Sequence, residues 1–179
     1  MMKKLVLFLF CTTALFISCS DDDNNDPPIG IDETALPGTW KLIAFRVNNG
    51  QTFIETDEER TLYSTFFSVG KDFETSLTFN QNPETFESDG GYTTVLTNTI
   101  VNQQPTTQEI PTPGFAASGN WQIKDGDLVL EVEGTEESFK ITGLNSELLF
   151  LEKELNQTFP LPGGTQVSTG MTFFAFGKQ

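Results

Sequence analysis

The fold of this 179-residue chain is decided by the stretch Asn120-Trp121-Gln122-Ile123-Lys124-Asp125-Gly126-Asp127-Leu128-Val129-Leu130-Glu131-Val132. Two runs of alternating apolar and polar residues flank the dipeptide Asp125-Gly126. Asp-Gly supplies the positive φ angles that a two-residue hairpin turn requires. One face of such a hairpin carries Trp121, Ile123, Leu128, Leu130 and Val132. The stretch therefore predicts an antiparallel β-hairpin with one apolar face.

Short runs of the same character recur along the chain, separated by Gly, Asn and Pro residues. They are rich in β-branched and aromatic residues, which favour a pleated, half-buried surface. The turn cluster Asn48-Asn49-Gly50 ends the first of them. The predicted strands span residues 40–47, 61–69, 76–80, 92–97, 137–142, 148–152 and 171–176. Regularly spaced short strands predict an antiparallel sandwich or barrel.

One segment permits a second interpretation. Thr56-Asp57-Glu58-Glu59 matches a helix capping box, and Leu62 with Phe66 fits a helical stripe. The residues from Thr61 onward are strand formers, so we expect a strand there and confine any helical turn to residues 57–60.

The stretch Asn102–Ala117 is predicted to be a long loop with frayed strand ends. It contains Pro105, Pro111 and Pro113, and proline lacks the amide donor that a central strand needs. Long loops of this kind often act as lids or binding loops.

The chain begins with a segment typical of export. Two lysines near the start precede the apolar run Leu5–Ile17, which is too short to span a bilayer, since spanning takes about 20 apolar residues. Ser18 and Cys19 follow this run. The segment resembles a bacterial lipoprotein signal, which implies cleavage before Cys19 and acylation of that cysteine. Acyl chains on Cys19 would attach the protein to the outer membrane.

The residues after Cys19 carry a further resemblance. Ser20, Asp21, Asp22 and Asp23 resemble the export signal of Bacteroidetes lipoproteins that are moved to the outer face of the outer membrane. The alternative is a solvated linker, because this stretch is too polar to bury a core. We therefore expect three parts: a signal peptide over residues 1–18, an acidic flexible tether over 19–35 and one folded domain over 36–179.

The composition excludes several classes of function. The chain has a formal net charge of −15 and no histidine. A strongly acidic protein repels nucleic acid. Cys11 lies in the predicted signal and Cys19 is the predicted lipid site, so no thiol remains for catalysis or for a soft metal. We therefore expect no enzyme activity, no metal and no cofactor.

The motif Gly38-Thr39-Trp40 at the start of the first predicted strand resembles the Gly-x-Trp motif of lipocalins. The segments Ser118–Trp121 and Ile141–Leu144 agree in order and spacing with lipocalin-like lipoproteins of Bacteroidetes. The resemblance implies an antiparallel up-and-down β-barrel of about eight strands, with Trp40 packed across its closed end. One element departs from the family: the arginine that stacks on the tryptophan has no match, because Arg46 and Arg60 are the only arginines and lie far from the carboxyl end.

Aromatic residues at strand spacing are the candidate ligand-binding residues. They are Trp40, Phe66, Phe79, Trp121, Phe139, Phe150 and Phe173. They line either an apolar cavity or an ordinary core. A small barrel holds one small molecule or fills its interior with side chains. The first case predicts a lipoprotein that binds a small hydrophobic ligand. The second predicts an interaction module that docks a protein or glycan through its acidic face or the 102–117 segment.

Overall fold

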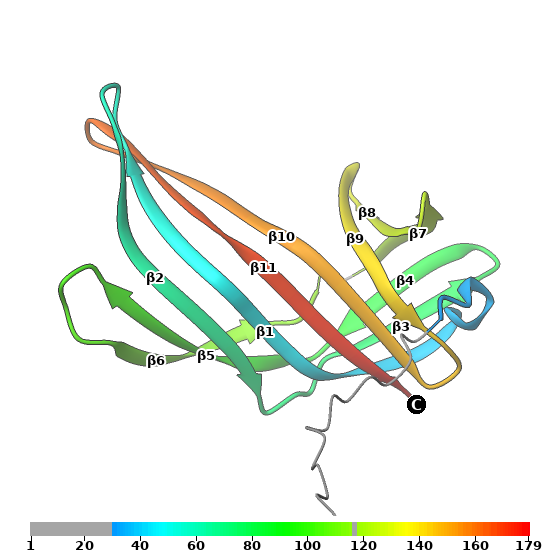
Figure 1. The fold of residues 1–179 in the computed structure, drawn as a ribbon. Helices are drawn as coiled ribbons and strands as arrows, with labels where there is room; N and C mark the ends of the chain where they lie inside the picture. The colour runs from blue at the N-terminus through cyan, green and yellow to red at the C-terminus, as the bar shows by residue number, and fades with distance from the viewer. Residues whose placement is uncertain (1–29, 116–117) are drawn as a thin grey trace, which may run out of the picture.

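The structure is a computed structural model that describes residues 30–115 and 118–179 (Figure 1). One short 3-10 helix, Glu33–Ala35, precedes eleven strands. The strands are β1 (Gly38–Glu55), β2 (Arg60–Lys71), β3 (Ser76–Gln81), β4 (Glu84–Asp89), β5 (Gly91–Ile100), β6 (Thr106–Pro113), β7 (Ser118–Lys124), β8 (Asp127–Val132), β9 (Thr135–Leu144), β10 (Leu148–Leu161) and β11 (Gly164–Lys178).

Eight of the strands form a closed antiparallel ring. Their order is β1-β3-β4-β7-β8-β9-β10-β11, and pairing between β11 and β1 closes the ring. The predicted all-β barrel of about eight strands is therefore confirmed. The hairpin at Asp125-Gly126 is also confirmed, since Lys124 pairs with Asp127 and both turn residues have positive φ.

Three further strands extend the barrel on one side. Residues 38–41 of β1 pair with β3, whereas residues 46–55 pair with β2 on the same edge. β2 then pairs with β5, and β5 with β6. As a result the long strands β1, β2, β10 and β11 run beyond the ring and form a curved wall together with β5 and β6 (Figure 1).

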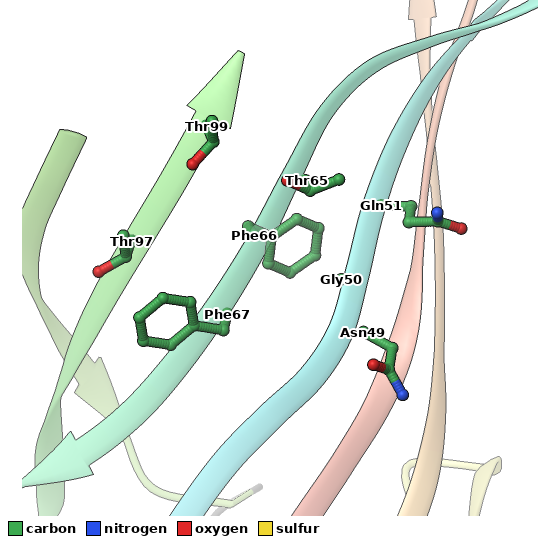
Figure 2. Close-up of a pocket in the computed structure, with 8 residues that line it drawn as sticks. All are labelled: Asn49, Gly50, Gln51, Thr65, Phe66, Phe67, Thr97 and Thr99. Carbon is green, nitrogen blue, oxygen red and sulfur yellow. The ribbon is translucent and has the colours of Figure 1, made fainter. Parts of the chain in front are cut away.

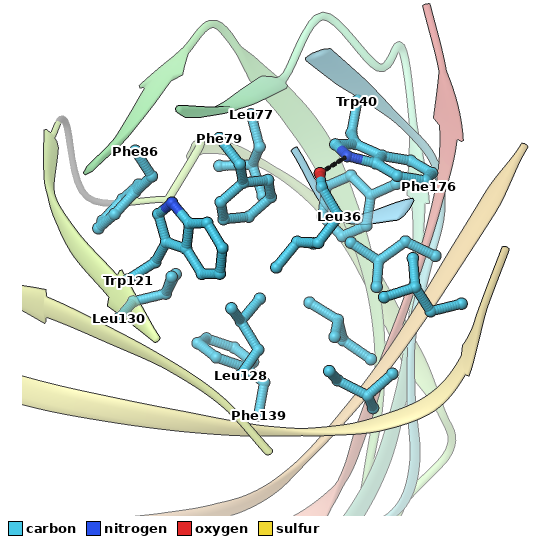
Figure 3. Close-up of a cluster of buried hydrophobic side chains, with 14 of the residues drawn as sticks. Leu36, Trp40, Leu77, Phe79, Phe86, Trp121, Leu128, Leu130, Phe139 and Phe176 are labelled. Carbon is cyan, nitrogen blue, oxygen red and sulfur yellow. Dashed lines mark hydrogen bonds between the residues drawn. The ribbon is translucent and has the colours of Figure 1, made fainter. Parts of the chain in front are cut away.

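The core fills the closed end of the ring (Figure 3). It holds Trp40, Phe79, Phe86, Trp121, Phe139, Phe176 and several leucines, nearly all of them buried. These residues occupy alternate positions on their strands, so one face of each strand points inward.

Trp40 closes this end of the barrel, as the resemblance implied. Its indole nitrogen donates a hydrogen bond of 2.7 Å to the Leu36 carbonyl (Figure 3). The Lys178 ammonium lies 4.8 Å from the Trp40 ring and donates a 2.5 Å hydrogen bond to the Ala35 carbonyl. Gly38 has a φ of 130°, and a Cβ there would lie 2.9 Å from the Lys178 side chain. Lys178 thus supplies the cation that stacks on Trp40, a position for which neither arginine of the sequence is a match.

Residues 31–35, which were predicted to end the tether, lie against the barrel. Ile31 forms a parallel bridge with Leu144, and the Asp32 amide donates to the Leu144 carbonyl at 2.8 Å. Leu36, which follows, is fully buried. The chain therefore joins the fold beside its closed end.

Two predictions were wrong, one about a turn and one about a long loop. Asn48-Asn49-Gly50 does not end the first strand: it forms a β-bulge, and β1 continues to Glu55. A bulge takes up an extra residue and bends the strand without ending it. Gly50 fits this place because a Cβ there would lie 2.5 Å from the Phe66 ring.

The second error is the long loop over Asn102–Ala117, which contains strand β6. Within the described residues β6 pairs only with β5, so Pro111 and Pro113 lie on an edge strand, where proline is tolerated. Hydroxyl pairs secure β6, with 2.6 Å between the side chains of Thr94 and Thr112. The strand predicted from Thr61 is confirmed as β2, and residues 57–59 contain no helical turn.

The substitution Trp40→Ala tests the closed end. Removing a fully buried tryptophan leaves a cavity and an unpaired Leu36 carbonyl, so we expect the free energy of unfolding to fall by about 3–5 kcal/mol. Urea denaturation measures this change. Phe67→Ala is the matched control, because Phe67 is 51% exposed and its loss should change stability by about 0.5 kcal/mol at most. Equal losses in the two variants would contradict the assignment.

Candidate functional site

An open trough lies above the core, on the concave face of the long strands. It has two sections, which share Leu155 and Gln157 of β10. The deep section has a volume of about 460 Å³ and borders the core. The mouth section has a volume of about 390 Å³ and lies between the wall of β1, β2 and β5 and the wall of β10 and β11. The barrel is thus filled at its closed end and open above it.

Aromatic rings form the floor of the deep section. Phe115 lies 5.0 Å from Phe174 and 5.5 Å from Phe139, measured between ring centroids. Phe45 joins Tyr92 to this cluster, at 5.0 Å from Tyr92 and 5.4 Å from Phe174. Tilted contacts of this kind stabilise aromatic clusters beyond the area that they bury. The floor can therefore receive an apolar group.

Tyr92 lines the deep section and keeps its proton to unusually high pH. Burial raises the pKa of its phenol from 10.0 to about 12, although the side chain of Thr94 lowers that pKa in part. Burial disfavours the charged form of a phenol. At neutral pH the deep section therefore contains an uncharged hydroxyl beside the aromatic floor.

One ion pair lies at the edge of the deep section. The Lys153 ammonium on β10 contacts the Glu137 carboxylate on β9 and lies 5.1 Å from the Phe139 ring. Pairing between β9 and β10 reaches only Lys140 and Glu152. The ion pair thus bridges the two strands where their backbones have separated.

The mouth section is lined by uncharged groups. Among the described residues that line it there is no charged side chain. Its hydroxyls belong to Thr52, Ser64, Ser68 and Ser168, and its amides to Asn98, Gln157 and Gln166. Aromatic rings come from Tyr63, Phe66 and Phe159, and aliphatic groups from Val47, Leu96 and Leu155. The Thr52 and Ser168 hydroxyls lie 3.2 Å apart and are hydrogen-bonded.

The structure separates the predicted ligand-binding residues into three groups. Trp40, Phe79 and Trp121 belong to the core at the closed end. Phe139 belongs to both the core and the floor of the trough, and Phe66 lines the mouth section.

Phe150 and Phe173 lie on the outer face of the barrel, so the structure does not bring them to the interior. The inward positions of their strands are taken by Leu149 and Leu151 on β10 and by Phe174 and Phe176 on β11. Phe150 and Phe173 instead line a groove of about 300 Å³ on the outside. The Arg46 guanidinium lies 4.6 Å from the Phe173 ring there.

A second outer groove crosses β1, β2 and β5 (Figure 2). It has a volume of about 490 Å³, and its lining includes Phe67 and the threonines Thr65, Thr97 and Thr99. These residues alternate with those that line the mouth section, so they lie on the opposite face of the same strands.

The sequence prediction missed several residues of the trough. Phe115 lies in the segment predicted to be a loop, and Lys153, Leu155 and Gln157 lie beyond the predicted end of their strand at residue 152. The signal that could have found them is the alternation of apolar residues along β10. Leu149, Leu151 and Leu155 are separated by even numbers of residues and therefore share one face of the strand.

The predicted lipidation site Cys19 and the predicted export signal Ser20–Asp23 lie outside the described residues. The described part of the chain has no helix capable of spanning a bilayer. It also has no group of three or more His, Cys, Asp or Glu side chains placed to hold a metal ion.

No protein-family model, no curated protein and no solved structure matches this chain.

Tyr92→Phe tests the environment of the phenol. Because the folded chain keeps this proton to a higher pH than the unfolded chain, the stability that Tyr92 contributes is complete below pH 10.0 and is lost as the pH rises toward about 12. We expect the free energy of unfolding of the wild type to fall more steeply across this window than that of Tyr92→Phe. Urea unfolding at several pH values measures both slopes, and parallel slopes would show that Tyr92 is not buried.

Proposed function

We propose that this protein is a non-catalytic, lipocalin-like lipoprotein of the bacterial outer membrane that binds one small ligand with an apolar part in its trough. Acyl chains on Cys19 anchor it, and residues 20–23 direct it to the cell surface. The observation that carries the ligand-binding role is the open aromatic floor above a filled core.

The dimensions of the trough support a small-molecule site. Its sections of about 460 and 390 Å³ fall in the range of roughly 300–1,000 Å³ that is usual for ligand pockets. Phe115, Phe139 and Phe174 offer apolar area to a ligand, and each square ångström removed from water contributes about 25 cal/mol. A ligand placed there would contact the floor on one side and the walls of β5 and β10 on the others.

The position of the chain's entry supports an anchored orientation. Residues 31–36 reach the barrel beside Leu144 and Trp40, at the closed end. The hairpin tips of β1–β2 and β10–β11 lie at the other end (Figure 1). An anchor that precedes residue 30 is therefore joined to the domain at its closed end, opposite the mouth of the trough.

A second candidate function is an interaction module. Phe67, which lines the groove in Figure 2, is 51% exposed, and Val69, two residues further along β2, is 45% exposed. Exposed apolar residues that gather on one face mark docking surfaces in some soluble proteins. On this alternative a protein partner covers the outer face and the trough holds only water.

Leu155→Trp tests the ligand-binding role. Leu155 lines both sections, so a larger side chain there should fill the trough and remove the ligand. We expect a small molecule to be extracted from the natively purified wild type and detected by mass spectrometry, and to be at least about tenfold depleted in Leu155→Trp. Asn156→Trp is the matched control, because Asn156 points to the outer face of the same strand. Two results together would favour the interaction module. The wild type would carry no small molecule, and substitution of Phe67 would abolish binding of a protein partner.

Cys19→Ala tests the anchor. Without the thiol there is no acylation, so we expect the variant to leave the membrane fraction and to lack the acylated amino-terminal peptide. Fractionation with immunoblotting and mass spectrometry of that peptide measure both effects. Ser18→Ala keeps the cysteine and a small residue before it, and it should remain in the membrane. Retention of Cys19→Ala in the membrane would overturn the lipid anchor.

A further inference from the structure

We propose that the mouth section binds an uncharged, hydroxyl-rich group of the sugar type, so that the ligand of the trough is a neutral glycoside with an apolar aglycone. This inference rests on the ligand-binding role proposed above, and it names the chemical class of the ligand.

The first observation is the absence of charge. The chain has 25 acidic and 10 basic residues, yet no charged side chain occurs among the described residues that line the mouth section. A charged group that enters such a site loses water without gaining a partner of opposite charge, which is costly. The acidic surface of the protein further opposes the approach of anions. The section therefore selects neutral ligands.

The second observation is the pairing of hydrogen-bonding groups on two facing walls. Ser64, Ser68 and Asn98 belong to the wall of β2 and β5, and Gln157 and Gln166 to the wall of β10 and β11. Hydroxyl and carboxamide groups both donate and accept hydrogen bonds, as the hydroxyls of a sugar do. A purely apolar ligand would leave these groups unpaired, at a cost for each.

The third observation is the set of aromatic rings among these polar groups. Tyr63 and Phe159 are 44% and 50% exposed, and Phe66 lines the same section. A sugar ring has faces of C–H groups and an edge of hydroxyls. Flat aromatic rings can cover the C–H faces while the amides reach the hydroxyls.

The two sections together define the whole ligand. Leu155 and Gln157 belong to both, so a single molecule can extend from one section to the other. Its apolar part would meet the floor at Phe115, Phe139 and Phe174, and its sugar part would lie between the polar walls.

The test compares three fluorescent probes with one shared coumarin ring. They are 4-methylumbelliferyl β-D-glucoside, 4-methylumbelliferyl sulfate and 7-methoxy-4-methylcoumarin, which carry a neutral sugar, an anion and a methyl group. Binding is measured by fluorescence titration of the lipidated protein in lipid nanodiscs, with empty nanodiscs as the reference. We expect the glucoside to bind at least about fivefold more tightly than either other probe, because one or two additional hydrogen bonds give a difference in affinity of this size.

Variants assign the effect to the mouth section. Gln157→Leu removes an amide of the trough and should weaken binding of the glucoside by about five- to tenfold, with little change for the methoxycoumarin. Asn156→Leu changes the adjacent outward residue and should leave all three affinities unchanged. Gln166→Leu on β11 provides a second inward variant should Gln157→Leu fail to fold.

The outcomes separate the two proposals. Equal binding of the glucoside and the methoxycoumarin, or tighter binding of the sulfate, overturns the sugar assignment and leaves the ligand-binding role standing. Binding of none of the probes to a folded wild type overturns the sugar assignment, and the ligand-binding role is then decided by whether a molecule is extracted from the natively purified wild type. Loss of glucoside binding in Asn156→Leu as well as in Gln157→Leu also overturns the assignment, because the effect would then not come from the trough.

Discussion

The ladder between β1 and β11 is the constraint on which the rest of the structure depends. It closes the eight-strand ring, because Trp40 pairs with Lys178 at its lower end, and it continues without a change of partner to the pair of Glu55 with Thr165. Every other long strand is placed against one of these two. The ladder thus belongs both to the filled barrel and to the open wall above it, and neither part could form without it.

The trough arises where the neighbours of this ladder change. On one side β1 exchanges β3 for β2, and on the other β10 separates from β9 after Glu152. The side chains change at the same level. The inward residues of β11 are aromatic near the closed end, at Phe176 and Phe174, and small and polar toward the mouth, at Thr172 and Ser168. A barrel that kept large aromatic residues along its whole length would have no room for a ligand.

The sequence was sufficient for the local elements and insufficient for the face on which some residues lie. Asp125-Gly126 determines its hairpin because few dipeptides allow a positive φ angle at both residues. The Gly38-Thr39-Trp40 motif likewise marks the closed end of the barrel. The face of Phe173 depends on its register against β1, which alternation alone does not determine when Phe173, Phe174 and Phe176 are all aromatic. The trough was not predicted because four of its inward residues, Lys153, Leu155, Gln157 and Phe159, lie on the part of β10 beyond the predicted strand 148–152, where polar residues interrupt the apolar alternation.

Two inward-facing cations, Lys178 and Lys153, each lie against an aromatic ring of the barrel interior. Lys178 caps the Trp40 ring where the barrel is closed, and its ammonium also satisfies the Ala35 carbonyl, so it completes a buried arrangement. Lys153 pairs with Glu137 in partial contact with solvent, and a pair of that kind contributes little to stability. Its place matters more than its energy, because Lys153 compensates the charge of the Glu137 carboxylate beside the aromatic floor near Phe139. Glu154 is the remaining charged residue among the described residues that line the deep section.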